Sequence, residues 1–315
     1  MGIEIPEPLA TAQTRSNGAA GRAFLAALPG LAADLLDRWD LRTDGPPMSG
    51  MTALVLPVRR GDGSGTTAVP GDGDGSGSDA VPGDDGGSAA VLKLPFRDAE
   101  TEGEPLALRA WDGDGAVRLL EHDPATGALL LERLTPVHHP DPHTAVLVVA
   151  RLLARLTAVP APAGLRRLAD IAGDLTDRTP WALTRVPDPD TRRLLADCAA
   201  AVREVLPEPG DRLLHWDLHY ENVLRAERSP SLAIDPKPLA GDPGFDLYPA
   251  LANRFDPADL PWRFDALTDV LGLDRNRARA WTLARVLQNA LWAVEDGDEM
   301  EEEVIEIGRR VRAWR

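Results

Sequence analysis

One segment constrains the fold of this chain more than any other. It reads HWDLHYEN over residues 215–222, and a second motif, IDP, follows at residues 234–236. Short apolar runs flank the first motif and lead into the second, as expected of buried strands separated by loops. This pattern predicts that Asp217 lies in a loop and Asp235 at the end of a strand, so that both carboxylates can face one cleft.

The residue types in these two motifs suit phosphoryl transfer. Such a reaction needs a carboxylate that takes or orients the proton of an acceptor hydroxyl, and an Asn and a second Asp that hold magnesium against the phosphates. Asp217, Asn222 and Asp235 match these three roles, and H-x-D-x-x-x-x-N is the catalytic-loop pattern of kinases. Trp216 stands where regulated protein kinases carry Arg, which argues against an activation loop ordered by phosphorylation.

Each of these residues taken alone is more typical of a cap, a turn or a solvated charge. Their combination, at this spacing and between strands, predicts an ATP-dependent kinase that uses Mg²⁺. Two further carboxylates, Asp242 and Asp246, follow the second motif. We expect both to act as turn formers and helix caps.

Longer runs around the motifs resemble a known family. HWDLHYENVL and LAIDPKPLAGDPGFDL, together with upstream runs such as LVLPVRR, AVLKL and LLLERL, resemble the aminoglycoside phosphotransferase family, especially its streptomycin and hydroxyurea kinases. The same motifs are similar to those of actinobacterial glucosamine kinases. The resemblance covers residues from about Met51 to Asn253. It implies a protein-kinase-like two-lobed α+β fold, with a small mixed lobe followed by a larger, mainly helical lobe.

The upstream runs predict the nucleotide site. Residues 54–58 and 89–94 are expected to pair as an antiparallel hairpin whose second strand carries Lys93, a residue suited to nucleotide phosphates. The resemblance implies that Glu104 orients this lysine, although Glu100 and Glu102 are near enough in sequence to compete.

The segment 129–134 is by resemblance the hinge where backbone groups of Glu132 and Leu134 meet adenine; an ordinary edge strand is the alternative. The turn between Gly45 and Gly50 is the expected phosphate-covering loop, because neither a Walker A motif nor G-x-G-x-x-G is present.

The expected acceptor site lies on a helix near the C-terminus. At three- and four-residue spacing, one face of this helix would present Gln288, Asn289, Trp292, Glu295 and Asp296. A Trp can cover a sugar ring, amides can bond hydroxyls, and carboxylates can meet an ammonium group. His219 and Asp217 complete the expected acceptor contacts. The alternative is that Trp292 packs in the core and the carboxylates are solvated.

These residues make free glucosamine the first choice of acceptor, because the predicted face suits one sugar ring. A streptomycin-type aminoglycoside is the alternative and would require a wider acidic cleft. A third possibility, from another functional class, is a catalytically silent nucleotide-binding scaffold. The presence of Lys93, Asp217, Asn222 and Asp235 together argues against it.

The resemblance implies two domains, 1–134 for the nucleotide and 135–315 for catalysis and substrate. Two short amphipathic helices, separated at Pro29-Gly30, are expected before residue 40, and longer helices over 144–158 and 191–206. Residues 61–88 are rich in Gly, Asp and Ser and repeat Ala-Val-Pro-Gly-Asp, which predicts a flexible insertion. Calcium binding there is disfavoured, because Gly83 stands where the closing Glu of such a loop belongs.

The composition indicates an intracellular enzyme. With 315 residues, 43% of them hydrophobic, the chain can build a large core, and its single cysteine, Cys198, is expected to be a buried apolar residue. No signal peptide or uninterrupted membrane span is evident, so we expect a cytoplasmic location. The formal net charge of −16 argues against binding to nucleic acid or membranes and favours a cationic small-molecule substrate. The oligomeric state is not predicted.

Overall fold

The computed structural model describes residues 3–61, 88–137 and 141–314. The chain forms two compact units, each made of two stretches of sequence. Unit 1 consists of Met1–Phe96 and Leu120–Arg133, and unit 2 consists of Arg97–Leu119 and Leu134–Arg315. The sequence places the boundary at residue 134, whereas here residues 97–119 group with the second unit. The predicted insertion at 61–88, with its calcium alternative, falls almost entirely outside the described residues.

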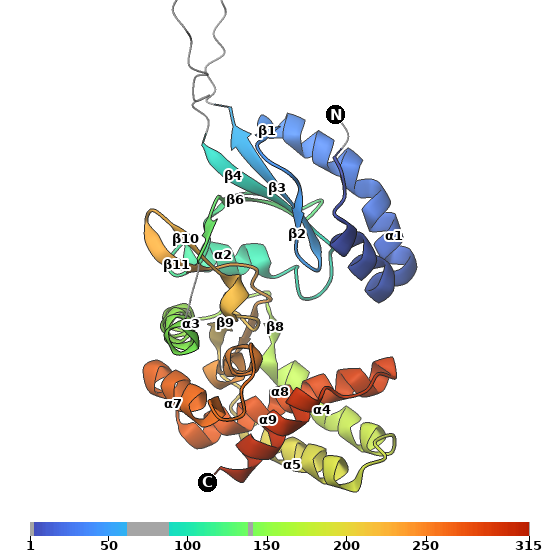
Figure 1. The fold of residues 1–315 in the computed structure, drawn as a ribbon, viewed down its shortest axis with the longest axis vertical. Coiled ribbons are helices and arrows are strands. Elements are labelled where there is room, and N and C mark those ends of the chain that lie inside the picture. Colours follow the sequence, from blue (N-terminus) through green and yellow to red (C-terminus); the bar gives the residue numbers. More distant parts are fainter. Residues whose placement is uncertain (1–2, 62–87, 138–140, 315) are drawn as a thin grey trace, which may run out of the picture. The chain divides into compact units, whose positions relative to one another are not determined.

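Unit 1 is an antiparallel sheet with one long helix (Figure 1). Its strands lie in the order β1-β3-β4-β6-β5, and β2 pairs with β3. The elements are α1 (Glu7–Arg38), β1 (Leu41–Thr43), β2 (Met48–Ser49), β3 (Ala53–Arg60), β4 (Ala89–Pro95), β5 (Leu119–Asp123) and β6 (Ala128–Glu132). The predicted hairpin of residues 54–58 and 89–94 is confirmed as β3 and β4.

The strand β4 separates an apolar face from a polar position. Leu92 and Leu94 belong to the core of unit 1, together with Leu54 and Leu56 of β3. Because side chains alternate along a strand, Lys93 projects from the opposite face, where it is only 6% exposed. Its register partner on β3 is Val55.

The helix α1 corrects one prediction. The chain does not break at Pro29-Gly30; instead Pro29 lies inside the helix, and the kink is at Gly18, whose φ of 49° and ψ of −119° favour glycine. A proline in a helix interior costs about 3 kcal/mol. Burial of Leu28 and Leu35 in the core of unit 1 offsets that cost, since each such side chain contributes roughly 1.5–3 kcal/mol.

By length and composition alone, α1 is also a helix that could cross a membrane, with a mean hydropathy of 1.3 in its most apolar window. Of that window, 22% is buried. The buried residues include Leu28, Ala32 and Leu35, which pack against the strands of unit 1. The same apolar composition therefore serves the core of this unit.

The segment between β6 and β7 (Thr135–Pro136) carries the chain from unit 1 to unit 2. The sheet order places β6 between β4 and β5, so it is an interior strand and the edge-strand alternative is wrong. Arg133 fixes the end of β6, because its guanidinium donates hydrogen bonds to the carbonyl of Val58 at 2.9 Å and to Asp44 at 2.7 Å. Glu132 is the last residue of β6, and Leu134 is the first of unit 2 after it.

Unit 2 is mainly helical, with two small three-stranded sheets. Strands β7, β10 and β11 form one sheet, and β8, β9 and β12 the other. Besides β7, its elements are α2 (Glu104–Trp111), α3 (Pro142–Leu156), β8 (Arg166–Arg167), α4 (Leu168–Leu183), α5 (Pro189–Val205), β9 (Arg212–Leu214), η1 (Tyr220–Asn222), β10 (Val223–Ala226), β11 (Ser229–Ala233), β12 (Leu239–Gly241), η2 (Pro243–Leu247), α6 (Tyr248–Ala252), α7 (Leu260–Leu271), α8 (Arg275–Asp296) and α9 (Glu302–Ala313).

The helix α8 is the centre of unit 2. It packs against α4, α5, α9 and η2, and from Ala278 to Leu291 nearly every residue is buried (Figure 1). Asp274 caps its N-terminus by accepting a hydrogen bond from the backbone N–H of Arg277. The predicted helices at 144–158 and 191–206 are confirmed as α3 and α5, within two residues at each end.

The two units together confirm the predicted α+β class, with an antiparallel sheet in unit 1 and mainly helices in unit 2. Cys198, on α5, is fully buried, and burial raises the pKa of its thiol to about 12. It is an apolar core residue, as the sequence predicts.

Candidate active site

The segment with the HWDLHYEN motif is held from behind by a buried carboxylate. The loop begins after β9, and Asp246 of η2 accepts hydrogen bonds from the backbone N–H groups of His215, at 2.8 Å, and of Trp216. Trp216 has a positive φ of 66°, an unusual conformation that these bonds support. Burial raises the pKa of Asp246 to about 7. Asp246 is expected from the sequence to form a turn or cap a helix; instead it accepts hydrogen bonds from a loop about 30 residues away.

A buried arginine supports the same loop. Arg285 of α8 donates to the carbonyl oxygen of Trp216 at 3.2 Å, and its guanidinium lies over the rings of Trp216, Phe245 and Tyr248. Burial lowers the pKa of Arg285 to about 10, which still leaves it charged at neutral pH. Asp246 and Arg285 therefore fix the backbone of the loop immediately before Asp217.

Hydrogen bonds connect Asn222 to Asp217, earlier in the chain, and to Ile234, later in the chain. Its side-chain nitrogen donates to the backbone carbonyl of Asp217 at 2.9 Å, and its backbone carbonyl accepts from the N–H of Ile234 at 3.0 Å. His215 adds a ring contact of 3.1 Å to the carbonyl of Ile234, and burial lowers its pKa to about 4, so the ring is neutral near pH 7. These bonds tie the catalytic loop to the strand that ends before Asp235.

The donor set fits magnesium. With its nitrogen bonded to Asp217, the amide of Asn222 can offer its oxygen to a cation, and Asp235 supplies a carboxylate. Hard oxygen ligands suit Mg²⁺, which takes its remaining ligands from water and phosphate. Among the described residues no group of three or more His, Cys, Asp and Glu is placed to hold a metal ion by itself.

A lysine that the sequence reasoning did not select contacts the expected catalytic carboxylate. The Nζ of Lys237 lies 2.9 Å from Oδ2 of Asp217 and 3.9 Å from Oε2 of Glu100. Burial opposes its charge, but Asp217, Glu100 and Asp235 outweigh burial and raise the pKa of Lys237. One signal in the sequence could have found it: the chain has only two lysines, and this one is two residues after Asp235.

The expected acceptor contact His219 has a partner within its own loop. Its Nδ1 lies 2.8 Å from Oε2 of Glu221, which also accepts a hydrogen bond from Asn253 and pairs with Arg254. Burial opposes ionisation of Glu221, but the hydrogen bond from His219 lowers the pKa of this carboxyl. An acceptor contact by His219 stays a prediction.

A cavity of about 550 Å³ lies within unit 2 beside this loop. The residues that line it come from the segment before α2, from β8 and α4, from the catalytic loop and from α8. They are Asp98, Ala99, Glu100, Arg166, Arg167, Asp170, Ile171, Asp174, Leu175, Arg178, Trp216, Gln288 and Trp292.

The predicted face of α8 meets this cavity only in part. Gln288 and Trp292 line it, but Asn289 donates its side-chain nitrogen to the carbonyl of Arg285 at 2.8 Å, Glu295 pairs with Arg178, and Asp296 is exposed. The i, i+3, i+4 spacing correctly predicted a shared helix face. Asn289 bonds within its own helix and Glu295 pairs with Arg178 of α4, and these partners could not be predicted from spacing alone.

Several polar atoms that line the cavity have no hydrogen-bond partner among the described residues. They include Nε1 of Trp216 and Oε1 of Gln288, each on a side chain only 3% exposed. Arg166 stacks over the Trp216 ring at 4.4 Å, and burial lowers its pKa; its Nε and Nη2 also lack partners there. Buried polar groups are normally satisfied, so these unpartnered atoms are exceptions among the residues around the cavity.

The predicted nucleotide residues divide between the units. Lys93 belongs to unit 1 and Glu104 to unit 2, and both are buried. The two competing carboxylates lie in unit 2 with other partners, Glu100 with Lys237 and Glu102 with Arg97 at 3.9 Å. The roles of Lys93, Glu104, Glu132 and Leu134 at the nucleotide stay predictions. So does the phosphate-covering loop, where Met48 and Ser49 pair with β3 and a turn begins at Gly50.

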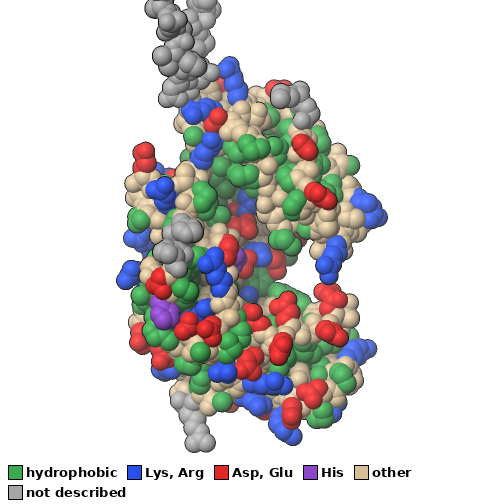
Figure 2. Space-filling model, viewed as in Figure 1, with side chains coloured by type: hydrophobic (Ala, Val, Ile, Leu, Met, Phe, Trp, Pro, Cys, Tyr) green, Lys and Arg blue, Asp and Glu red, His purple; other side chains and the backbone are tan. Residues whose placement is uncertain are grey.

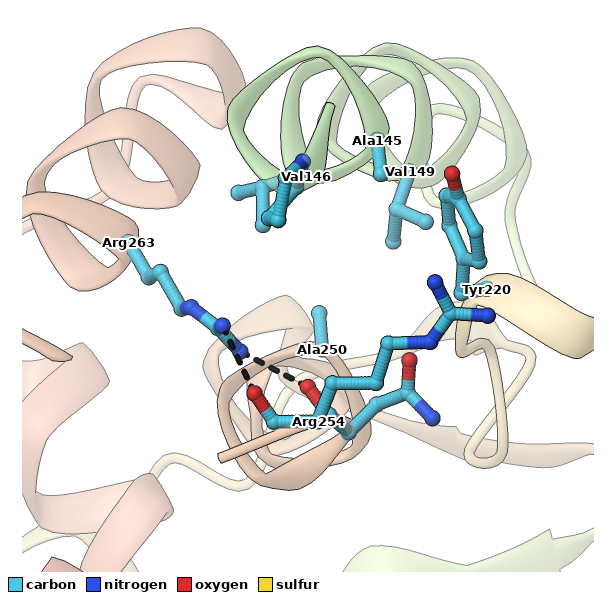
Figure 3. A pocket seen from close by; sticks show the side chains of 9 residues that line it. Ala145, Val146, Val149, Tyr220, Ala250, Arg254 and Arg263 are labelled. Carbon is cyan, nitrogen blue, oxygen red and sulfur yellow. Dashed lines mark hydrogen bonds between the residues drawn. The ribbon is translucent and has the colours of Figure 1, made fainter. Parts of the chain in front are cut away.

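A second cavity, shown in Figure 3, is much smaller, about 20 Å³. Val146 and Val149 of α3 line one side of it and Tyr220 and Arg254 another. Arg263 donates to the backbone carbonyl of Asn253 at 2.7 Å and to that of Arg254. This volume suits a water-sized group, so the larger cavity is the better candidate for a substrate.

Acidic and basic side chains are interspersed over the face of unit 2 that Figure 2 shows. Several basic side chains of unit 2 form ion pairs, such as Arg310 with Glu306 and Arg312 with Asp197.

Comparison with solved structures identifies the fold. A thermostable mutant of an aminoglycoside phosphotransferase, solved with ADP and hygromycin B, superposes with a TM-score of 0.56 at 13% identity, covering 89% of this chain and 96% of that one. A choline/ethanolamine kinase family protein from Mesorhizobium loti gives 0.57 at 19% identity, covering 93% and 92%. The predicted protein-kinase-like fold is thus confirmed.

Sequence comparison identifies the family. The family model described as "Aminoglycoside/hydroxyurea antibiotic resistance kinase" matches residues 69–297. The hydroxyurea phosphotransferase of Kitasatospora aureofaciens is 56% identical over 94% of this chain and 82% of its own length, and the streptomycin 6-kinase of Streptomyces glaucescens is 51% identical over 94% and 92%. The chain belongs to the aminoglycoside/hydroxyurea antibiotic resistance kinase family and is a small-molecule phosphotransferase.

Proposed function

We propose that this protein transfers the γ-phosphoryl group of ATP, as its magnesium complex, to a hydroxyl of a streptomycin-type aminoglycoside. The observation that carries this proposal is the position of the larger cavity. Lys237 contacts both the expected catalytic carboxylate of Asp217 and Glu100, which lines that cavity. An acceptor held there would meet the catalytic loop.

The size and charge of the cavity favour an aminoglycoside over smaller acceptors. A volume of about 550 Å³ lies in the range of pockets for drug-sized ligands and exceeds what one sugar ring or hydroxyurea needs. The carboxylates of Asp98, Glu100, Asp170 and Asp174 can pair with guanidinium or ammonium groups. Arg166 and Gln288 can bond hydroxyls. This is the acceptor class that the sequence places second; glucosamine, its first choice, has no support from the relatives.

The catalytic loop supplies the chemistry. ATP provides the phosphoryl group, and magnesium, held by Asn222 and Asp235, would neutralise charge on the phosphates. Asp217 orients the acceptor hydroxyl and takes its proton, while Asp246 and Arg285 hold the loop in place. The names of two relatives, both streptomycin 6-kinases, suggest the 6-hydroxyl as the position that is phosphorylated.

Hydroxyurea is the second candidate acceptor, because the relative at 56% identity is a hydroxyurea phosphotransferase. The discriminating experiment is ADP release from magnesium ATP with streptomycin, hydroxyurea, glucosamine, glucose, N-acetylglucosamine and kanamycin as acceptors. Turnover that is fastest with streptomycin, with the product phosphorylated at the 6-position by NMR, supports the proposal. Preference for hydroxyurea or glucosamine overturns the aminoglycoside assignment, and absence of turnover with every acceptor favours the nucleotide-binding scaffold.

A cytoplasmic location remains part of the proposal. It follows from the need for ATP and from the expectation drawn from the sequence. Fractionation of the native host, with immunodetection of the protein in soluble and membrane fractions, tests it. Recovery in the membrane fraction would overturn it.

A further inference from the structure

Both the backbone and the side chain of Lys237 contact the loop that contains Asp217. Its backbone N–H donates to the carbonyl of His215 at 3.0 Å, and its Nζ lies 2.9 Å from Oδ2 of Asp217. The ammonium therefore reaches Asp217 from a fixed starting point. The side chain is 31% exposed, so the pair is partly open and within reach of a ligand.

The choice of lysine at this position is informative. The chain carries 34 basic residues, and all but two of them are arginine. An ammonium is a compact charge with three donors on a flexible stem, whereas a guanidinium is a planar fork. A lysine can hold one carboxylate oxygen and still turn its remaining donors toward other groups. Glu100 lies close enough, at 3.9 Å, to share that charge.

We propose that Lys237 is a positioning residue for phosphoryl transfer: it holds Oδ2 of Asp217 so that Oδ1 meets the acceptor hydroxyl, and it links this carboxylate to the wall of the acceptor cavity at Glu100. The proposal rests on phosphotransferase activity and not on the identity of the acceptor. In the step itself, the acceptor oxygen forms a bond to the γ-phosphorus, the bond from that phosphorus to the β,γ-bridging oxygen breaks, and ADP leaves. The hydroxyl proton passes to Asp217.

The cation has an electrostatic task as well as a geometric one. Asp217, Glu100 and Asp235 all act electrostatically on Lys237, in a site that must also accept the negative charge of ATP. Without a cation in this group, the carboxylate of Asp217 would repel the phosphates. A lysine fixed beside Asp217 offsets that repulsion and keeps the carboxylate in the orientation that the hydroxyl needs.

The chain itself allows a test that separates the ammonium from the fold. Cys198 is the only cysteine and is fully buried, so Lys237→Cys in a Cys198→Ala background presents one accessible thiol. Alkylation of that thiol with 2-bromoethylamine rebuilds a lysine-like side chain with a sulfur in its stem. The parent for comparison is Cys198→Ala treated with the same reagent.

We expect Lys237→Cys to lower kcat by roughly 10²-fold, the effect of a misplacement of about 1 Å at a reacting group, while KM for ATP changes little. Alkylation should restore at least about a tenth of the parent kcat, a gain that a purely structural role would not give. Lys237→Arg should recover less than the alkylated protein, because the planar fork meets Asp217 differently. Retention of full kcat by Lys237→Cys, or no gain on alkylation in a protein with an unchanged thermal transition, overturns the proposal.

Turnover is measured with streptomycin and also as acceptor-independent hydrolysis of ATP, in which water replaces the acceptor hydroxyl. If the parent hydrolyses ATP but does not phosphorylate streptomycin, the acceptor assignment fails while the role of Lys237 is still tested on hydrolysis. If alkylation restores neither activity, the role of Lys237 fails whatever the acceptor is.

Discussion

The catalytic segment and the acceptor cavity are built in opposite ways. The catalytic segment runs from His215 to Lys237, and its bonds connect residues that are near one another in sequence, such as Asn222 to Asp217. The cavity beside it is assembled from four distant stretches, which include Glu100, Arg166 and Trp292. Chemistry common to a family can stay in one continuous motif. A site that chooses an acceptor draws on side chains whose proximity only the fold creates.

This comparison assigns different kinetic consequences to the two regions. Changes in the catalytic segment should lower turnover with every acceptor, because they affect the transferred group. Changes in the cavity should alter acceptor binding and leave hydrolysis of ATP in place. The kinetic consequences are given from the largest expected effect to the smallest, and one consequence for stability follows them.

Asp217→Asn should give the largest loss. Removal of the group that takes the hydroxyl proton lowers kcat by about 10²- to 10⁴-fold. Binding of ATP, measured by calorimetry, should survive, because Asp217 is not among the residues expected to hold magnesium. Turnover close to that of the natural protein would show that another group orients the acceptor.

Asp235→Asn should lower activity by roughly 10- to 10²-fold and raise the magnesium concentration needed for half-maximal turnover. The loss follows from replacing a carboxylate ligand of a divalent cation with a neutral amide. Titration of activity with MgCl₂ at fixed ATP measures it. A variant with an unchanged magnesium requirement would remove Asp235 from the metal site.

Trp292→Ala should raise KM for the acceptor by roughly tenfold, because the exposed indole lines the cavity and can cover a sugar ring. Hydrolysis of ATP without acceptor should stay unchanged. Asp296→Ala is the matched comparison on the same helix, since Asp296 is exposed and does not line the cavity. If the two changes raised KM equally, the cavity would not be the acceptor site, because only Trp292 lines it.

The last prediction concerns stability, not catalysis, as a function of pH. In the folded protein the pKa of His215 is lowered from 6.5 to about 4, so as pH falls through this window the unfolded state takes up a proton first and stability decreases. The pKa of Asp246 is raised from 3.8 to about 7, so over the same window the folded state takes up a proton first and stability increases. The two effects oppose each other.

Asp246→Asn removes the gain in stability that comes from protonation of Asp246 and leaves the loss of stability that comes from His215. The variant should therefore lose stability more steeply than the natural protein between about pH 6.5 and 4, by up to about 1.4 kcal/mol per pH unit. Urea unfolding at several pH values measures the difference. If the free energy of unfolding depended on pH in the same way for both proteins, the raised pKa of Asp246 in the folded state would be wrong.

Much of the fold could be predicted because periodic apolar patterns determine element type. The hairpin of β3 and β4, the helices α3 and α5 and the strands around the catalytic loop follow from alternation or helical spacing. The failure at Pro29 has a physical origin as well. A local rule against proline in helices was overridden by burial of Leu28 and Leu35, which local sequence does not report.

For the candidate site, the sequence by itself determined the catalytic segment. Asp217, Asn222 and Asp235 lie within twenty residues of one another, so their spacing alone was enough to predict a shared chemistry. Only the tertiary structure decided the partners of that segment. It brought Asp246, Arg285 and the acceptor cavity to the loop, because these contacts arise from helix packing and burial, whose partners are far apart along the chain.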